Sequence, residues 1–307
     1  MGISVSKLPG IQTVTGLKIQ KALRKHLIPY SFLLPSFGIL LVFGLYPFLQ
    51  GLYYSFTDYP LIQGPTFVGL DNYLKLPKDY LFRASLVNTF YYVAVTVPAR
   101  IILGLALALA LNKATRGVTV FRAIFYFPFI VPLVTAAQLW GWMFSTHFGI
   151  INWFLSVFGI DPVPWLTSPK WAMPAIMIMS VWTVIGWNMV IFLAGLQGIP
   201  PDLYEAAQVD GANAWKTFWH ITLPLLRPTL LLVLVISTIN SSQVFDQVFV
   251  LTNGGPGYAT MTLVQQVYNT AFQSYEMGYA SAIAVVLFLI VLSLALIQFR
   301  FFGQEAD

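Results

Sequence analysis

The sequence predicts an all-α protein that sits in a membrane and crosses it six times. The 307-residue chain is 58% hydrophobic and 9% charged, whereas about a quarter of the residues in an ordinary soluble domain are charged. Its mean hydropathy is +0.75. Six apolar stretches each reach the length of about 20 residues that a helix needs to cross a bilayer. The chain has no cysteine, which excludes disulfide bonds and thiolate metal sites.

The six predicted spans follow one another with polar segments between them. They cover residues 27–56, 86–111, 120–144, 171–196, 229–251 and 277–299. The first span has no charged residue and is longer than a bilayer requires, so we expect a tilted helix or an interfacial first turn. The third span contains Pro128 and Pro132, which a membrane helix tolerates when its neighbours satisfy the carbonyl groups that proline leaves free.

The segments outside the spans have their own patterns. Residues 1–26 carry five basic residues, and the apolar run that follows is too long for a signal peptide and lacks a small-residue cleavage site. We therefore expect a retained cytoplasmic tail, followed by one membrane domain over residues 27–307. Residues 145–170 combine Asp161 with prolines and aromatic residues, which is typical of a structured surface loop with an interfacial helix.

Lysine and arginine are distributed unequally between the two predicted sides of the membrane. The side that holds both termini, residues 112–122 and the segment between the fourth and fifth spans has eleven basic residues, and the opposite side has four. Basic residues collect on the cytoplasmic side, so both termini are expected there. This scattered distribution also argues against a nucleic-acid partner despite the net charge of +5.

One polar segment, residues 198–224, interrupts the apolar pattern between the fourth and fifth spans. Pro200 and Pro201 are expected to end the preceding helix. Asp202 is a good N-cap for the next helix, and Glu205 would then fall at its third position, where it can complete a capping box.

The same segment contains a turn signal and a second helix start. Gly211 can adopt a positive φ where the chain turns, and Pro224 can open the next helix. From these features alone, the segment is a capped pair of short helices lying at the membrane surface.

The spacing of these residues resembles the EAA pattern, which marks the cytoplasmic coupling loop in permease subunits of binding-protein-dependent ABC importers. The residues that carry this pattern are Glu205, Ala206, Ala207, Gly211, Ile221, Leu223 and Pro224. The resemblance implies the fold of a type I importer permease, in which this loop docks into a groove of an ATP-hydrolysing subunit. For Glu205, a purely local capping role stays open.

A second resemblance concerns the carbohydrate-uptake subclass of these permeases. Residues 244–256, with the sequence VFDQVFVLTNGGP, and residues 278–284, GYASAIA, are similar to that subclass. Its members import maltose-like oligosaccharides, other glycosides, and glycerol-3-phosphate or its diesters. The resemblance implies this class of solute for the chain.

Polar residues of the fourth and fifth spans are the candidates for the solute pathway, since the resemblance places solute contacts in the spans that flank the coupling loop. Successive residues of a helix are 100° apart, so four side chains of the fifth span fall on one face. The fourth span has a comparable polar cluster, which includes an indole suited to a sugar ring. The candidates are Ser237, Asn240, Ser241 and Val244, together with Thr183, Trp187 and Asn188. The alternative is hydrogen bonding between helices without solute contact.

Two ionisable residues lie inside predicted spans. Arg100 either binds an anionic solute or bonds to carbonyl groups freed by Pro98. Asp246 lies about 180° around the fifth span from Ser237, so we expect it against a neighbouring helix or at the outer mouth.

No enzyme site is evident in the sequence. It has no phosphate-binding loop of the type Gly-x4-Gly-Lys-Ser/Thr, no nucleophile elbow, and three histidines without partners at metal-ligand spacing. We therefore expect no cofactor in this chain. The resemblance implies that partner subunits bind ATP and Mg²⁺. It also implies three kinds of partner, a second homologous permease, two ATP-binding subunits and an extracytoplasmic solute-binding protein, and a location in a prokaryotic cell membrane.

Two other functions stay open at this point. An ion-driven secondary transporter would show inverted repeats or broken midplane helices with ion ligands. An export or membrane-scaffold component would need no externally delivered solute.

Overall fold

The computed structural model describes residues 32–60, 62–112 and 117–302. Contacts divide the chain into two units, residues 1–53 and residues 54–307. The described part of the first unit is a helix, Phe32–Tyr54, that runs one residue beyond this boundary. It includes a π-helical stretch, Leu41–Leu45, and ends as α2 (Tyr46–Tyr54). The expected tail, residues 1–26, lies outside the described residues.

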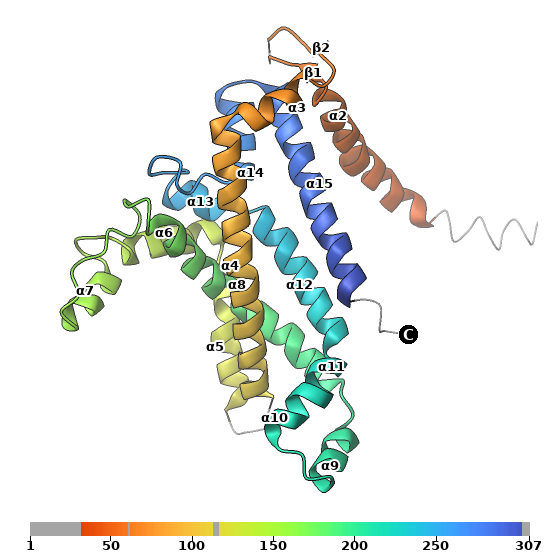
Figure 1. Cartoon of the computed structure of the whole chain (residues 1–307), viewed down its shortest axis with the longest axis vertical. Coiled ribbons are helices and arrows are strands. Elements are labelled where there is room, and N and C mark those ends of the chain that lie inside the picture. The colour runs from red at the N-terminus through yellow and green to blue at the C-terminus, as the bar shows by residue number, and fades with distance from the viewer. Residues whose placement is uncertain (1–31, 61, 113–116, 303–307) are drawn as a thin grey trace, which may run out of the picture. The chain divides into compact units, whose positions relative to one another are not determined.

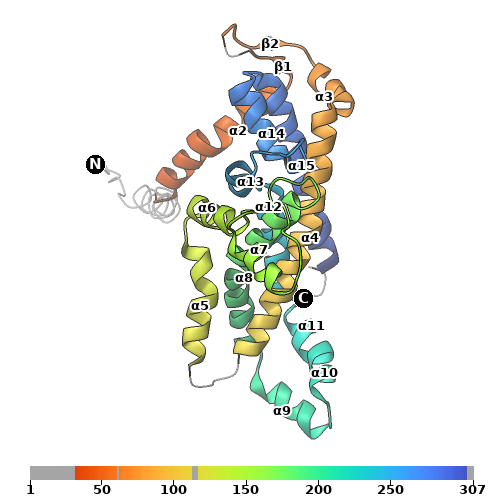
Figure 2. The same ribbon diagram turned by 90° about the vertical axis from the view of Figure 1, so that its left-hand side faces the viewer.

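The second unit is a helical bundle (Figures 1 and 2). Helix α4 packs against α8 and α12, α5 packs against α8, and α12 packs against α15. The bounds of these five helices are Tyr80–Leu111 for α4, Val118–Ile130 for α5, Ala172–Gln197 for α8, Arg227–Ser242 for α12 and Met277–Phe302 for α15. Helices α4, α8 and α15, with Phe32–Tyr54, are each long and apolar enough to span a membrane, which matches four of the predicted spans.

Helix α4 begins earlier than the predicted second span because Asp79 caps it. The Asp79 carboxylate accepts a hydrogen bond from the Leu81 backbone N–H at 2.8 Å. Its other oxygen accepts from Tyr279 Oη at 2.8 Å and from Gln266 Nε2 at 3.2 Å. One carboxylate therefore fixes the start of α4 against α14 (Leu263–Tyr268) and α15.

The predicted third span is broken, which corrects the expectation of one continuous helix. It consists of α5 and α6 (Leu133–Met143), whose axes differ by 98°. The break lies at Val131, whose φ of −68° and ψ of 131° are extended, and at Pro132. A proline disfavours the helical conformation of the residue before it, so the helix ends there.

The predicted fifth span ends sooner than expected. Helix α12 stops at Ser242, and α13 (Asp246–Leu251) follows after a short connection. The region before α12 is also bent, since the helical segment Ala214–Leu225 and α12 differ in direction by 68°. Counting each bent pair as one span gives up to six spans in the described residues.

Smaller elements cover the end of the second unit that lies away from α9 and α10 (Figures 1 and 2). Strands β1 (Thr57–Asp58) and β2 (Thr66–Phe67) pair antiparallel, with Thr57 opposite Phe67. Helix α3 (Asp71–Lys75), a 3₁₀ turn (Leu76–Lys78) and α14 complete this end, and a π-helical turn, Asn269–Gln273, follows α14. The Asn72 amide donates hydrogen bonds to the Ser55 and Thr57 carbonyls at 3.0 and 2.8 Å, which holds the hairpin to α3.

A helix forms in the surface loop where one is predicted, as α7 (Ile150–Val157). Buried Asn152 holds the loop together. Its Nδ2 donates to the Val163 carbonyl at 2.9 Å, and its Oδ1 accepts from the Val163 N–H at 3.1 Å and from Trp165 Nε1 at 3.0 Å. Apolar side chains along the other side of α7 are exposed.

Glycines let the central helices approach closely. A Cβ atom on Gly186 of α8 would lie 2.0 Å from the Phe125 carbonyl oxygen of α5. A Cβ atom on Gly104 of α4 would lie 2.8 Å from Cβ of Asn188 in α8. The core between α4, α8 and α12 includes Ala108, Met189, Phe192, Leu193, Leu226 and Val233.

Candidate functional site

The polar segment between α8 and α12 folds into two short helices joined by a turn, as the sequence predicts. The helices are α9 (Pro201–Val209) and α10 (Ala214–Thr217). The start of α9 differs from the expectation. Pro200 occupies the N-cap position of α9, and no side chain caps this helix.

The predicted capping box is therefore absent. Because Pro201 takes the first helical position, Asp202 is the second residue of α9 and Glu205 the fifth. Proline suits the first position, since its missing N–H has no partner there in any case. Asp202 still places negative charge near the positive end of the helix dipole. Glu205 is exposed, and within the described residues its carboxylate has no hydrogen bond or ion pair.

Gly211 closes α9 as predicted. Its φ is +75°, in the left-handed region. The Ala212 N–H donates to the Ala207 carbonyl at 2.8 Å, and the Gly211 N–H donates to the Gln208 carbonyl at 3.1 Å. This is the Schellman arrangement, in which a left-handed glycine satisfies the last carbonyls of a helix.

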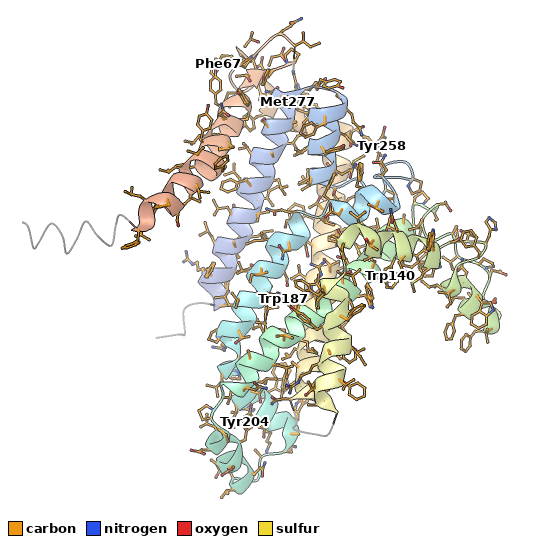
Figure 3. All side chains as sticks on the ribbon, turned by 180° about the vertical axis from the view of Figure 1, so that it is seen from behind. Phe67, Trp140, Trp187, Tyr204, Tyr258 and Met277 are labelled. Atoms are coloured by element: carbon orange, nitrogen blue, oxygen red, sulfur yellow. The ribbon has the colours of Figure 1, made fainter. Side chains whose placement is uncertain are left out.

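The second helix has its own cap and its own link back to α9. The Asn213 side chain accepts a hydrogen bond from the Lys216 N–H at 2.9 Å. A π-helical turn, Phe218–Thr222, follows α10, and the Thr222 hydroxyl lies 3.3 Å from Tyr204 Oη of α9. The two short helices are thereby held as one hairpin. Figure 3 labels Tyr204 at the end of the second unit that carries α9 and α10.

The hairpin exposes a mixed apolar and acidic surface, which we call the coupling surface. It consists of Glu205, Ala206, Val209, Trp215 and Trp219. Val209 is 88% exposed and Trp215 is 68% exposed, so large apolar side chains face outward. The rings of Trp215 and Trp219 contact each other edge to face, with centroids 5.6 Å apart. Such a patch is typical of a protein interface.

The other residues of the EAA pattern lie inside or beside the hairpin. Ala207 is buried, which means that it packs within this chain. Ile221, Leu223 and Pro224 are half-buried. Pro224 lies in α11 (Leu223–Leu225), a short helix before α12, so the membrane helix itself opens with Arg227 and Pro228.

The predicted polar face of the fifth span is mostly buried within the chain. Ser237 and Ser241 lie inside the bundle, Asn240 is exposed, and Val244 lies beyond the end of α12. The Asn188 amide of α8 donates to Ser237 Oγ at 3.5 Å. Ser241 Oγ accepts from Arg100 Nη1 at 2.7 Å. Both serines thus bond to other helices in this conformation.

The cluster expected on α8 has one side chain that is partly accessible. Thr183 is buried and its hydroxyl donates to the Met179 carbonyl of its own helix at 2.9 Å. Asn188 is buried too. Trp187 is half-buried and stacks on Phe129 of α5, with ring centroids 4.8 Å apart and planes 18° apart. Figure 3 shows Trp187 roughly midway along the unit.

Arg100 has partners that the sequence did not indicate. The residue is 3% exposed, and its guanidinium bonds to hydroxyl groups of Ser180 in α8 and Ser241 in α12. Neither carbonyls freed by Pro98 nor an acidic residue is among its partners in the described residues. Tyr92 Oη, about two helical turns earlier on α4, also bonds to Ser180 Oγ.

Asp246 lies outside the fifth span, which corrects its predicted depth within that helix. It is the first residue of α13, and it is exposed. Phe245 and Phe249 flank it and stack with centroids 5.3 Å apart, and both contact Tyr268 near the end of α14.

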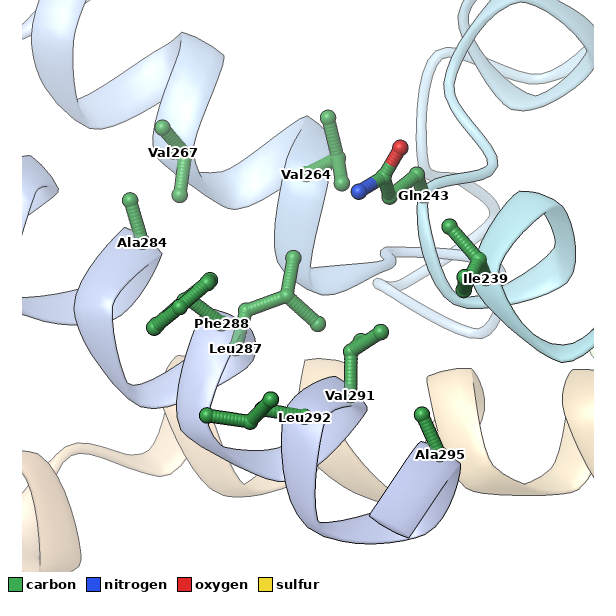
Figure 4. A pocket seen from close by; sticks show the side chains of 10 residues that line it. All are labelled: Ile239, Gln243, Val264, Val267, Ala284, Leu287, Phe288, Val291, Leu292 and Ala295. Carbon is green, nitrogen blue, oxygen red and sulfur yellow. The ribbon is translucent and has the colours of Figure 1, made fainter. Parts of the chain in front are cut away.

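The groove in Figure 4 lies between α12, α14 and α15 and has a volume of about 600 Å³. Gln243 is the one polar side chain among its ten lining residues. A hydroxyl-rich solute would find few hydrogen-bond partners there, and none of the candidate pathway residues lines it. The groove therefore suits apolar chains rather than a sugar.

The described residues contain no group of three or more His, Asp or Glu side chains that could hold a metal ion.

Comparison with known proteins agrees with this geometry. Residues 100–302 match the family described as binding-protein-dependent transport system inner membrane component. The trehalose/maltose transport system permease protein MalF of Thermococcus litoralis is 39% identical over 278 residues, covering 90% of this chain and 94% of that protein. The sulfoquinovosyl glycerol transport system permease protein SmoG of Agrobacterium fabrum is 34% identical over 277 residues, covering 90% of each chain.

A solved structure has the same fold along nearly the whole chain. It belongs to a bacterial ABC transporter involved in the import of the acidic polysaccharide alginate. The TM-score is 0.83 at 26% identity, with 94% of this chain and 100% of that chain covered. The bundle is the type I importer permease fold. The family match covers well over half of the residues and includes the whole coupling hairpin. The chain therefore belongs to the family of binding-protein-dependent transport system inner membrane components.

Proposed function

We propose that this chain is the permease subunit of an ABC importer for a sugar or sugar-like solute, such as an oligosaccharide, a glycoside or a glycerophosphate. The observation that carries the proposal is the exposed coupling surface, on a hairpin that lies in the chain between α8 and α12. The names of the two relatives support the solute class, since both refer to transport of sugars or sugar derivatives.

Energy for transport comes from another chain. As a member of its family, this chain is a membrane permease and not an enzyme, and ATP is hydrolysed by a separate subunit. We propose two ATP-binding subunits, which hold ATP and Mg²⁺ and dock on the coupling surface. Glu205 would meet a basic residue there, while Ala206, Val209 and the two tryptophans supply apolar contact.

A second homologous permease and an extracytoplasmic solute-binding protein complete the proposed complex. A related transporter, for alginate, has been crystallised together with a substrate-bound periplasmic protein. The charge distribution supports a cytoplasmic position for both termini and the coupling hairpin. The binding protein would then dock at the opposite end, near α3, α13 and α14.

In the proposed cycle, closure of the ATP-binding subunits pushes on the coupling hairpin. The hairpin moves α8 and α12, and the bundle changes from inward-facing to outward-facing, so the docked binding protein releases its solute. Trp187 and Asn240 are the candidate pathway residues most accessible in this conformation. The other candidate pathway residues, Ser237, Ser241, Thr183, Asn188 and Val244, are buried in this conformation.

Uptake by the assembled transporter tests this function. The chain is purified with its partner subunits and reconstituted into liposomes, and the solute is first chosen by thermal-shift screening of the binding protein against neutral sugars and glycerophosphates. We expect uptake that needs both ATP and the solute-loaded binding protein.

The outcomes separate the alternatives. Uptake that persists without ATP but follows an ion gradient would indicate a secondary transporter and contradict the proposal. ATP-driven movement of solute out of the lumen that corresponds to the cytoplasm, without any need for the binding protein, would indicate an exporter.

A further inference from the structure

The buried hydroxyl cluster around Arg100 joins three helices. Arg100 Nη1 donates to Ser241 Oγ of α12 at 2.7 Å. Nη2 donates to Ser180 Oγ of α8 and lies 3.5 Å from the Ser180 carbonyl oxygen. Tyr92 Oη bonds to Ser180 Oγ, and the Thr96 hydroxyl lies 3.2 Å from Ser241 Oγ. A single guanidinium on α4 thus bonds to both α8 and α12.

A charged side chain in this position is costly, which argues for a specific role. Arg100 is 3% exposed, and its Nε has no hydrogen-bond partner. In the part of the chain that the structure describes, no carboxylate forms an ion pair with it. Intramembrane charges are rare and usually functional. Binding of an anionic solute fits poorly here, because the solute would first have to open both serine contacts.

The cluster lies deep in the membrane, far from the coupling hairpin. Arg100 is eleven residues from the end of α4 at Leu111, or about 17 Å along the helix. Ser180 precedes the end of α8 by seventeen residues, about 26 Å, and Ser241 follows the start of α12 by fourteen, about 21 Å. The three side chains therefore meet near or beyond the middle of the bilayer.

Other contacts join these helices closer to the hairpin. A Cβ atom on Gly195 of α8 would lie 2.5 Å from Thr229 Oγ1 at the start of α12. Further along, Asn188 contacts both Gly104 and Ser237. These contacts fix α8 and α12 to each other near the coupling hairpin, where the force from the ATP-binding subunits would enter. If no contact joined the two helices deeper in the membrane, they could pivot about these points. The movement of the hairpin would then not reach the middle of the bilayer.

We propose that Arg100 is a positioning residue that makes α4, α8 and α12 move as one body, so that a push on the coupling hairpin reaches the middle of the membrane. The proposal rests on the proposed coupling function. Arginine suits this role because its planar fork directs separate N–H groups to acceptors on two helices, whereas lysine is a single point charge.

Three variants in the assembled transporter test this role. Arg100→Gln removes the charge and part of the fork, Arg100→Lys keeps the charge alone, and Ser180→Ala removes one acceptor. Ser293→Ala is the matched control, because the Ser293 hydroxyl donates only to the Leu289 carbonyl of its own helix, at 2.7 Å. Two quantities are measured: retention of the ATP-binding subunits during purification, and the ratio of solute taken up to ATP hydrolysed.

We expect Arg100→Gln and Ser180→Ala to retain the ATP-binding subunits and still hydrolyse ATP, while the uptake ratio falls about tenfold, within the range of typical coupling energies. Arg100→Lys should give an intermediate ratio, and Ser293→Ala the wild-type ratio.

Two results would overturn the proposal. One is a wild-type ratio in both Arg100→Gln and Ser180→Ala. The other is a lower yield or a lower melting temperature of the complex with a normal ratio in the complex that remains, because that pattern indicates a role in folding alone. Failure of the proposed function looks different, since the wild-type complex itself would then show no ATP-driven uptake.

Discussion

Gly211 sets the shape of the coupling hairpin. Its φ of +75° turns the chain between α9 and α10 and allows the Ala212 N–H to reach the Ala207 carbonyl. No atom of the described residues lies within 4 Å of the position that a Cβ would take. A side chain at this position would therefore strain the backbone but would not clash with a neighbour. An L-residue in this conformation costs about 1 kcal/mol.

Gly211→Ala should therefore weaken docking of the ATP-binding subunits by roughly fivefold, because holding alanine in the left-handed conformation of the turn costs about 1 kcal/mol. Gly198→Ala is the control in the same segment, since Gly198 has a φ of −78° in the right-handed helical region. Affinity is measured by titrating ATP-binding subunits onto the permease in nanodiscs. Equal affinities for the two variants would contradict this role of Gly211.

Single residues were predictable from the sequence where their signal is local. A glycine between two short helices indicates a positive φ, and Gly211 has one. The N-cap of α9 was wrong by two positions, because Pro201 competes with Asp202 for the start of the helix. The partners of Arg100 were missed, since Ser180 and Ser241 are 80 and 141 positions away and serines are common throughout the chain.

At the scale of elements, the prolines within the predicted spans have different effects. Pro98 and Pro128 lie inside α4 and α5, whereas Pro132 separates α5 from α6 with a bend of 98°. A hydropathy profile shows how long an apolar stretch is but not whether its helix bends, so a bent span has the same profile as a straight one. The broken third and fifth spans were therefore not predictable from hydropathy, while the unbroken spans were.

Close packing of α8 against α5 gives a prediction about elements. Gly186→Ala should lower the melting temperature of the purified protein, because the new Cβ would lie 2.0 Å from a backbone oxygen of α5. Overpacking of this kind costs about 1–3 kcal/mol. Gly141→Ala in α6 is the control, since its Cβ would meet its nearest atom at 3.6 Å. Equal melting temperatures would contradict the close α5–α8 contact.

At the scale of the second unit, the two ends have different roles. One end carries the coupling hairpin, and the other carries the β1–β2 hairpin, α3, α13 and α14 (Figures 1 and 2). The apolar stretches and the EAA pattern were enough to predict the importer permease fold. The depth at which α4, α8 and α12 are joined depends on contacts between distant residues, which required the structure.

The central claim is that the coupling hairpin docks on an ATP-binding subunit. A photo-crosslinking amino acid at Val209, whose side chain is 88% exposed, reports the neighbours of this surface without disturbing packing. The matched position is Asp161, an exposed residue of the 145–170 loop, which the charge distribution predicts on the other side of the membrane. In the assembled transporter, we expect a cross-link to the ATP-binding subunit from position 209 and none from position 161. A cross-link to that subunit from position 161, or none from position 209 in a complex that retains it, would contradict the account.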